Sequence, residues 1–453
     1  MISFVEAFRV GSRVCGIAVF AFACLTWPGM ARAQDEERIV TYEEILADPD
    51  NIELTVLYAR QRIDAGELQK AAVSLERVLL LNPDLDQARL LYAIVLYRIA
   101  NFTEAQAELE TLKERDLAPT ESDLVDQYLA RIAERARPWS AFLTFGLGAH
   151  YDTNRNYHPS SGEVVVLDTV FTATGEEEDD FGFLAFMSGE YAHKLSPVEP
   201  AEVFVRGALV GDEQIREDRL DLLGVFAGIG GRTTVETIDL EALADVTVIG
   251  LGDEHFLDVY KGALRASRSY NVDGLPVKPF AEIGAGYEDF DPTKDATFAN
   301  EEDGPFAFAA VGVSADFTPR AQGSLKLGLR RKDADQDFNS FWRYDVAATA
   351  AFVLSDDLLL RGFSSAAIED YSEPDPFISA TTERRDYDFR VGFDFVQRLD
   401  PLWEMLGVEM NGNPIAGIAA TVGASYEVSD SNLRNFDYDN FRVRALISKR
   451  VNF

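Results

Sequence analysis

The chain contains few residues of the kinds that catalyse reactions, and their spacing matches no catalytic or metal-binding motif. No His-Glu-x-x-His metal site, Gly-x-Ser-x-Gly elbow or glycine-rich phosphate loop is present. The histidines are His150, His158, His193 and His255. Acidic residues number 77, so the adjacency of two carboxylates carries no information. We therefore predict that the protein is not an enzyme and has no catalytic residue, cofactor or metal ligand.

Charge and hydropathy narrow the class of protein further. The 453 residues carry a net charge of −35, which argues against a nucleic-acid partner because phosphate contacts need clustered Lys and Arg. The mean hydropathy of −0.09 excludes a helical-bundle membrane protein. It is compatible with a membrane barrel, in which apolar and polar residues alternate along each strand.

The N-terminal residues are typical of a secretory signal peptide. Arg9 and Arg13 precede the apolar run 14–27, and Ala31 and Ala33 flank Arg32. We expect residues 1–33 to be removed. Because Cys15 and Cys24 are the only cysteines, the mature protein would then contain no disulfide and no cysteine nucleophile.

Residues 34–138 read as a helical domain with an internal repeat of 34 residues. Ala71 corresponds to Ala105 and Leu75 to Leu109. This pattern resembles two tetratricopeptide repeats, with a capping helix at 121–137. The repeat suggests a groove that holds an extended or partly folded client on the periplasmic side. An even number of barrel strands would place both barrel ends on that side with the helical domain. The residues expected to line this groove are Thr55, Arg62, Arg89 and Leu96.

Residues 139–453 consist of alternating segments of roughly ten residues separated by Gly, Pro, Asn and Asp clusters, which is the pattern of an outer-membrane barrel. The fold prediction is therefore a periplasmic helical domain followed by an antiparallel transmembrane β-barrel. Odd-numbered strands would run outward, with short periplasmic turns. We count fourteen strands, near 140–151, 181–193, 201–211, 219–232, 236–249, 255–268, 277–288, 305–316, 321–331, 341–354, 357–369, 385–397, 413–427 and 438–453.

The alternation also predicts which side chains face lipid. Leu240 and Phe393 belong to apolar sets that point outward, and Glu241 and Asp394 to charged sets that point into the lumen. On the last strand only Lys449 interrupts the apolar set.

Acidic runs at 176–180 and at Asp333, Asp335 and Asp337 contain the oxygen ligands that Ca²⁺ and Mg²⁺ prefer, and such ions would bridge to lipopolysaccharide phosphate. Neither run has the spacing of a calcium loop. We favour solvated surface charge.

The chain ends on apolar residues. Val451 and the terminal Phe453 resemble the signal that the outer-membrane barrel assembly machinery reads, so that machinery is an expected partner.

A motif lies at the end of the first strand, and its residues are Gly148, Tyr151, Asp152, Asn154 and Asn156. This motif and the order of parts together resemble the surface lipoprotein assembly modifier family, although Thr153 replaces the commoner Ser. The resemblance implies an outer-membrane translocon that moves surface lipoproteins, or soluble haem- or metal-acquiring proteins, from the periplasm to the cell surface of a Gram-negative bacterium.

Two alternatives remain open at this point. Polysaccharide exporters also join tetratricopeptide repeats to a barrel, although the resemblance gives them more repeats and sixteen to eighteen strands. A passive porin or an adhesin with a helical spacer is the other alternative.

Overall fold

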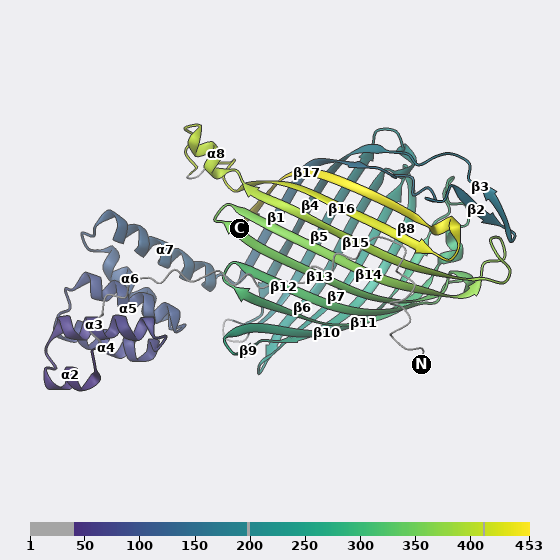
Figure 1. Ribbon diagram of the computed structural model, residues 1–453. Coiled ribbons are helices and arrows are strands. Elements are labelled where there is room, and N and C mark those ends of the chain that lie inside the picture. The colour runs from purple at the N-terminus through teal and green to yellow at the C-terminus, as the bar shows by residue number, and fades with distance from the viewer. Residues whose placement is uncertain (1–39, 197–199, 411–412) are drawn as a thin grey trace, which may run out of the picture. The chain divides into compact units, whose positions relative to one another are not determined.

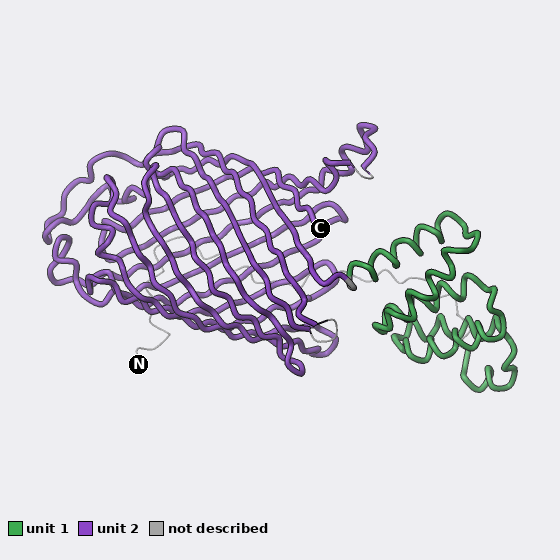
Figure 2. The backbone as a smooth tube through the Cα atoms, turned by 180° about the vertical axis from the view of Figure 1, so that it is seen from behind, with its two compact units in different colours: residues 1–135 green, residues 136–453 purple. Residues whose placement is uncertain are grey.

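The computed structural model describes residues 40–196, 200–410 and 413–453. The predicted signal peptide, residues 1–33, lies outside the described residues. The chain divides into two compact units, residues 1–135 and 136–453, shown in different colours in Figure 2. Each unit is described below by itself.

The first unit consists of antiparallel helix pairs. Asn51 caps α3 by accepting a hydrogen bond from the Leu54 amide at 3.0 Å, and Thr41 caps α2 through the Glu44 amide. No helix among the described residues is long and apolar enough to span a membrane. The helices are α2 (Tyr42–Ala47), α3 (Ile52–Asp64), α4 (Leu68–Leu81), α5 (Asp86–Arg98), α6 (Phe102–Lys113) and α7 (Pro119–Ala136).

The predicted 34-residue repeat is confirmed in the packing. Ala71 and Ala105 are both fully buried where the two helices of a pair approach closely, and Leu75 and Leu109 fill the equivalent space one turn later. The turns also correspond, but not in residue type. Gly66 has φ +74° between α3 and α4, and Ala100, 34 residues later, has φ +64° between α5 and α6. A left-handed conformation is strained for alanine.

The second unit is a closed antiparallel barrel of fourteen long strands, as predicted (Figure 1). Neighbours in sequence pair with each other, β17 closes on β1, and the small strand β9 (Tyr270–Val272) lengthens the hairpin between β8 and β10. A separate two-stranded hairpin, β2 (Glu163–Val166) with β3 (Thr169–Thr172), lies in the first loop. The long strands are β1 (Trp139–Asp152), β4 (Asp180–Lys194), β5 (Ala201–Gln214), β6 (Leu222–Val235), β7 (Ile238–Leu251), β8 (Glu254–Arg268), β10 (Leu275–Phe290), β11 (Gly304–Thr318), β12 (Ala321–Lys332), β13 (Phe341–Ser355), β14 (Leu358–Pro374), β15 (Glu383–Arg398), β16 (Ile418–Ser431) and β17 (Tyr438–Asn452).

Most strand boundaries agree with the prediction within about three residues, the usual uncertainty at element ends. The exceptions are the end of the eleventh strand, predicted at 369 and observed at Pro374, and the thirteenth strand, predicted at 413–427 and observed at Ile418–Ser431. Pro414 lacks a backbone N–H and Gly417 has φ +78°, so neither continues a regular strand and β16 begins after them.

The two faces of the barrel wall follow the predicted register. Leu240 and Phe393 lie on the outer face and are exposed, as are the apolar residues of β17 such as Ile447. Asp394 is buried on the inner face. The exposed apolar outer face is the surface expected to contact lipid.

The barrel has two different rims. The turn rim carries both ends of the barrel and short turns such as 319–320 and 356–357, whereas the loop rim carries the long connections 153–179, 291–303 and 375–382 (Figure 1). One long connection, 399–417, lies on the turn rim and contains the short helix α8 (Asp400–Met405).

Candidate functional site

The motif at the end of β1 lies at the seam where β17 closes the barrel. Gly148 pairs with Leu446, and a Cβ on Gly148 would overlap the backbone carbonyl of Ala445. Glycine is therefore required there by the close approach of the two strands.

Asp152 is the centre of a buried polar cluster across this seam. Its side chain has no exposed surface and accepts hydrogen bonds from Arg442 Nε and Asn440 Nδ2, both at 2.7 Å. His150 Nδ1 lies 2.6 Å from the other carboxylate oxygen, and His150 Nε2 lies 2.6 Å from Asp212 on β5. When His150 is protonated, both ring nitrogens donate to carboxylates. The cluster therefore links β1 to β17 and to β5.

The rest of the motif shapes the first loop. The Asn154 side chain accepts from the His158 amide and donates to the His158 carbonyl, both at 2.9 Å, and Asn156 donates to the Glu176 carbonyl at 3.0 Å. Tyr151 donates to Asp179 at 3.2 Å. These residues are structural, because each of these side chains bonds within the loop it begins.

We call residues 153–179 the seam strap, because they run along the loop rim over the strands next to the seam. The Ser160 amide donates to the Asp437 carbonyl at 2.8 Å, in the β16–β17 loop. The Leu167 amide donates to the Phe377 carbonyl at 3.0 Å, in the β14–β15 loop. The strap therefore bonds to the loops that connect β14 to β15 and β16 to β17.

The inner face of the barrel carries acidic and basic side chains that pair with each other. Glu190 on β4 accepts from Arg206 at 2.6 Å and from Arg232 at 2.8 Å. Arg206 also contacts Glu241 at 3.1 Å. The guanidinium of Arg206 stacks on the buried ring of Phe204, 4.2 Å from the ring centroid.

Acidic and basic side chains also pair on β10 and β12 and on β15 and β17. Glu288 contacts Lys332 at 2.8 Å, and Arg330 is its second partner. Asp394 accepts two hydrogen bonds from Arg444 Nη2, at 2.8 and 2.9 Å. Partnering of this kind offsets the cost of placing charge inside the wall.

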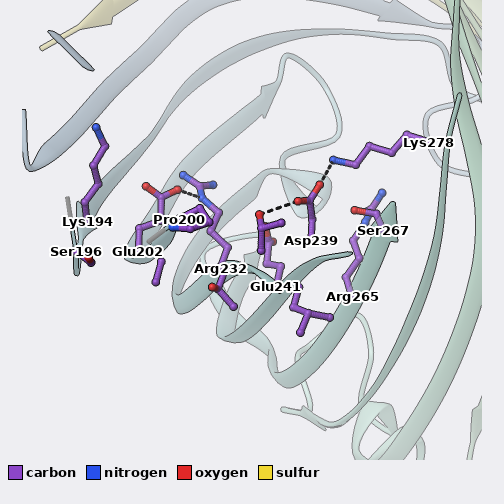
Figure 3. A pocket seen from close by; sticks show the side chains of 14 residues that line it. Lys194, Ser196, Pro200, Glu202, Arg232, Asp239, Glu241, Arg265, Ser267 and Lys278 are labelled. Carbon is purple, nitrogen blue, oxygen red and sulfur yellow. Dashed lines mark hydrogen bonds and ion pairs between the residues drawn. The ribbon is translucent and has the colours of Figure 1, made fainter. Parts of the chain in front are cut away.

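A recess of about 660 Å³ opens on the lumen side of the turn rim (Figure 3). Asp239 on its wall bonds to Lys278 at 2.7 Å and to Thr234 at 2.9 Å, and Glu202 pairs with Arg232. Within the described residues, no group of His, Cys, Asp and Glu side chains could hold a metal ion. The recess thus offers charges of both signs, which suit a polar surface of mixed charge.

Of the four residues predicted to line a client groove, two are buried between helices and two form ion pairs within the helical unit. Thr55 and Leu96 are buried, each about 2% exposed, so they pack between helices. Arg62 pairs with Glu67 at 2.9 Å, and Arg89 pairs with Glu108 and donates to the Pro83 carbonyl at 2.7 Å.

Contacts within the helical unit shift the pKa values of two of its side chains. Hydrogen bonds from Lys70 and Arg62 lower the pKa of the Glu67 carboxyl. Burial, together with a hydrogen bond to Glu104, raises the pKa of the Tyr92 phenol.

Other residues of α3, α5 and α7 offer exposed positive charge, namely Arg60, Arg98 and Arg131. The sequence could have indicated that Arg60 is exposed, because it directly follows Ala59, a position of the repeat that is buried.

The expected assembly signal lies at the turn rim. Val451 pairs with Leu143 on β1. Phe453 is 56% exposed, and its amide donates to the Ala141 carbonyl at 2.9 Å.

Comparison with known proteins supports the helical prediction in part of the chain. Residues 62–121 match the model of the tetratricopeptide repeat family. No curated protein matches the chain.

Solved structures that resemble the chain include two membrane barrels and one repeat domain. The TodX monoaromatic hydrocarbon channel deltaS2 mutant is 11% identical, with 70% of this chain and 91% of that chain covered and a TM-score of 0.36. The outer membrane protein OpdK from Pseudomonas aeruginosa is 9% identical, with 69% and 99% covered and a TM-score of 0.30. The TPR2B domain of yeast Sti1 is 14% identical, with 20% and 77% covered and a TM-score of 0.19. These scores are low, so the fold assignment here rests on the strand pairing itself.

Proposed function

We propose that this chain is an outer-membrane translocon that delivers a client protein from the periplasm to the cell surface. The client is a surface lipoprotein or a soluble haem- or metal-acquiring protein. One observation carries the proposal: a helical repeat unit and a fourteen-strand barrel with a charged inner face occur in one chain, joined directly before β1 at the turn rim.

The orientation follows from this connection. The turn rim would face the periplasm together with the helical unit, and the loop rim with the seam strap would face outward. Outer-membrane barrels commonly have short periplasmic turns and longer extracellular loops, which supports this orientation.

The charge pattern of the inner face favours a polypeptide as the cargo. Its charged groups largely alternate in sign and pair with one another, as Glu190 does with Arg206 and Arg232. A wall of this kind presents polar groups without a strong field of one sign, and it therefore suits a protein surface better than a small ion of one charge.

The test measures, on intact cells that express this chain, the protease accessibility of a lipoprotein displayed on their surface. Removal of residues 42–137 should leave the barrel in the outer membrane and the lipoprotein in the periplasm. Unchanged display with an inserted barrel would exclude the translocon. Loss of surface polysaccharide instead of lipoprotein would favour export of polysaccharide.

A finer variant tests capture by the helical unit. Arg60→Glu with Arg98→Glu reverses two exposed charges and should reduce display, since reversed charge repels what the arginines attract. The matched control is Lys70→Glu with Lys113→Glu, which reverses exposed charges on the second helices of the pairs. Equal effects of the two double variants would count against capture by α3 and α5. Arg62 and Arg89 are unsuitable here, because their side chains are only 24% and 12% exposed and their reversal would break half-buried ion pairs. The ion pairs of Lys70 and Lys113 are exposed, and such pairs contribute only about 0–1 kcal/mol.

A further inference from the structure

The connection between β15 and β16 places a small amphipathic helix on the turn rim. In α8 and the residue after it, Leu402, Met405 and Leu406 are exposed by 44%, 76% and 63%. At about 100° per residue these three share one side of the helix, and Asp400 and Glu404 lie on the other. An exposed apolar patch of this kind marks a surface that a membrane or another molecule covers.

Lys449 shows on which side of the barrel wall this connection lies. It is aligned with Phe145 on β1 and Ile418 on β16, in the set of β17 that faces outward. Its ammonium group donates a hydrogen bond to the carbonyl of Pro414 within the connection. The connection is therefore tied to the outer face of the wall, and Lys449, the one interruption of the apolar set, has a partner there.

The connection is fastened to the rim at both of its ends. Asp400 pairs with Arg398 at 2.6 Å and accepts from the Gly417 amide at 2.7 Å, and the Leu399 amide donates to the Ile418 carbonyl at 2.9 Å. Figure 1 shows α8 beyond the end of the barrel at which the C-terminus lies. The outer face of the strands that it joins is apolar, with Phe395 and Val422 exposed.

We propose that α8 lies in the headgroup region of the membrane leaflet at the turn rim, with Leu402, Met405 and Leu406 in the acyl boundary. Because the connection is tied to the lipid-facing surface at this rim, lipid is the nearest apolar medium that can cover the patch. Amphipathic helices lie about 5–10 Å into this boundary, and tryptophan, here Trp403, is enriched at it.

The charge of the connection defines the lipid class. Residues 399–417 contain Asp400, Glu404 and Glu409 and no Lys or Arg. Attraction to anionic lipid cannot contribute, so apolar burial alone holds the helix. We therefore expect binding to zwitterionic phospholipid, and the anchor does not depend on what the barrel transports.

The experiment uses the full chain with Cys15→Ser and Cys24→Ser, folded into phosphatidylcholine vesicles. Met405→Cys and Glu404→Cys, one on each side of α8, carry the same environment-sensitive fluorophore. Quenching is measured with a nitroxide on the lipid acyl chain near the headgroup and with aqueous iodide. Heat-modifiable migration on a gel confirms that each variant forms the barrel.

For an interfacial helix, lipid-borne nitroxide should quench the label at 405 at least about threefold more than the label at 404, and iodide should show the reverse order. Equal quenching of both sites by iodide would overturn the proposal. A label at 405 shielded from both quenchers would also overturn it, because a protein partner or a second copy would then cover the patch.

Discussion

At the scale of single residues, the seam depends on a few side chains that share one carboxylate. Asp152 accepts from Arg442, Asn440 and His150 and has no exposed surface. Removing a group of this kind leaves its partners unpaired away from water, which costs more than the lost bonds alone.

We expect Asp152→Ala to destabilise the folded barrel by about 3–5 kcal/mol, because Arg442 and His150 lose their shared partner. The measurement is the urea unfolding free energy of the barrel in vesicles. Asp179→Ala is the matched control, since Asp179 also bonds to Arg216 but is half exposed, and it should cost about 0–1 kcal/mol. Similar losses from both variants would mean that the cluster is not buried in the membrane-embedded protein.

Adjacent residues in the middle of β4 test the two faces of the wall. Met187 is exposed on the outer face, and Ser188 lies on the inner face near Glu190. Met187→Arg should destabilise the barrel by about 2–4 kcal/mol, because it places a charge in the middle of the lipid. Ser188→Arg should change the unfolding free energy little. The reverse order would require a register shifted by one residue.

At the scale of elements, the two helical turns differ at one corresponding position. Ala100 adopts the left-handed conformation that Gly66 adopts in the first repeat. Ala100→Gly should stabilise the helical unit by about 1 kcal/mol, since glycine has no Cβ to strain. Ala107→Gly, at an exposed site within α6, should destabilise it by about 1 kcal/mol. Thermal unfolding of the helical signal in the full chain decides the sign.

The last strand carries a second element-scale prediction. Phe453 contributes a backbone bond to Ala141 and an exposed ring. We propose that Val451 and Phe453 are read by the assembly machinery, so Phe453→Asp should leave the chain in the periplasm, whereas Phe453→Tyr should insert. Heat-modifiable barrel in outer-membrane fractions of the Asp variant would refute this role.

At the scale of the whole molecule, the route of the cargo depends on whether the seam opens. β1 and β17 pair continuously from Phe142 with Asn452 to Asp152 with Arg442. The seam strap adds bonds to two further loops. Opening the seam would break the hydrogen bonds between β1 and β17 and those of the seam strap at the same time. We therefore expect the cargo to pass through the lumen.

A disulfide across the seam tests this route. Ala149 and Ala445 are aligned neighbours on β1 and β17. With Cys15→Ser and Cys24→Ser, Ala149→Cys and Ala445→Cys should form a bond under oxidation and leave lipoprotein display unchanged. The single variant Ala149→Cys controls for oxidation. Display that stops on oxidation and returns on reduction would show that the seam opens.

The sequence by itself determined the strand count, the two faces of the wall and the 34-residue repeat. These features depend on the period at which side chains return to the same face, two residues in a strand and 3.6 in a helix, and this period can be read from neighbouring residues in the sequence. Leu240 and Glu241, and Ala71 and Ala105, therefore lie where their spacing predicts.

The tertiary structure alone decided which residues meet. Thr55 and Leu96 turned inward because neighbouring helices pack on that side, and a helix that is largely apolar all round does not mark its free face in the sequence. Asp152 and Arg442 are 290 residues apart in sequence, and only the closure of the barrel brings them together. The same holds for Lys449, whose partner Pro414 lies in a connection that no period describes.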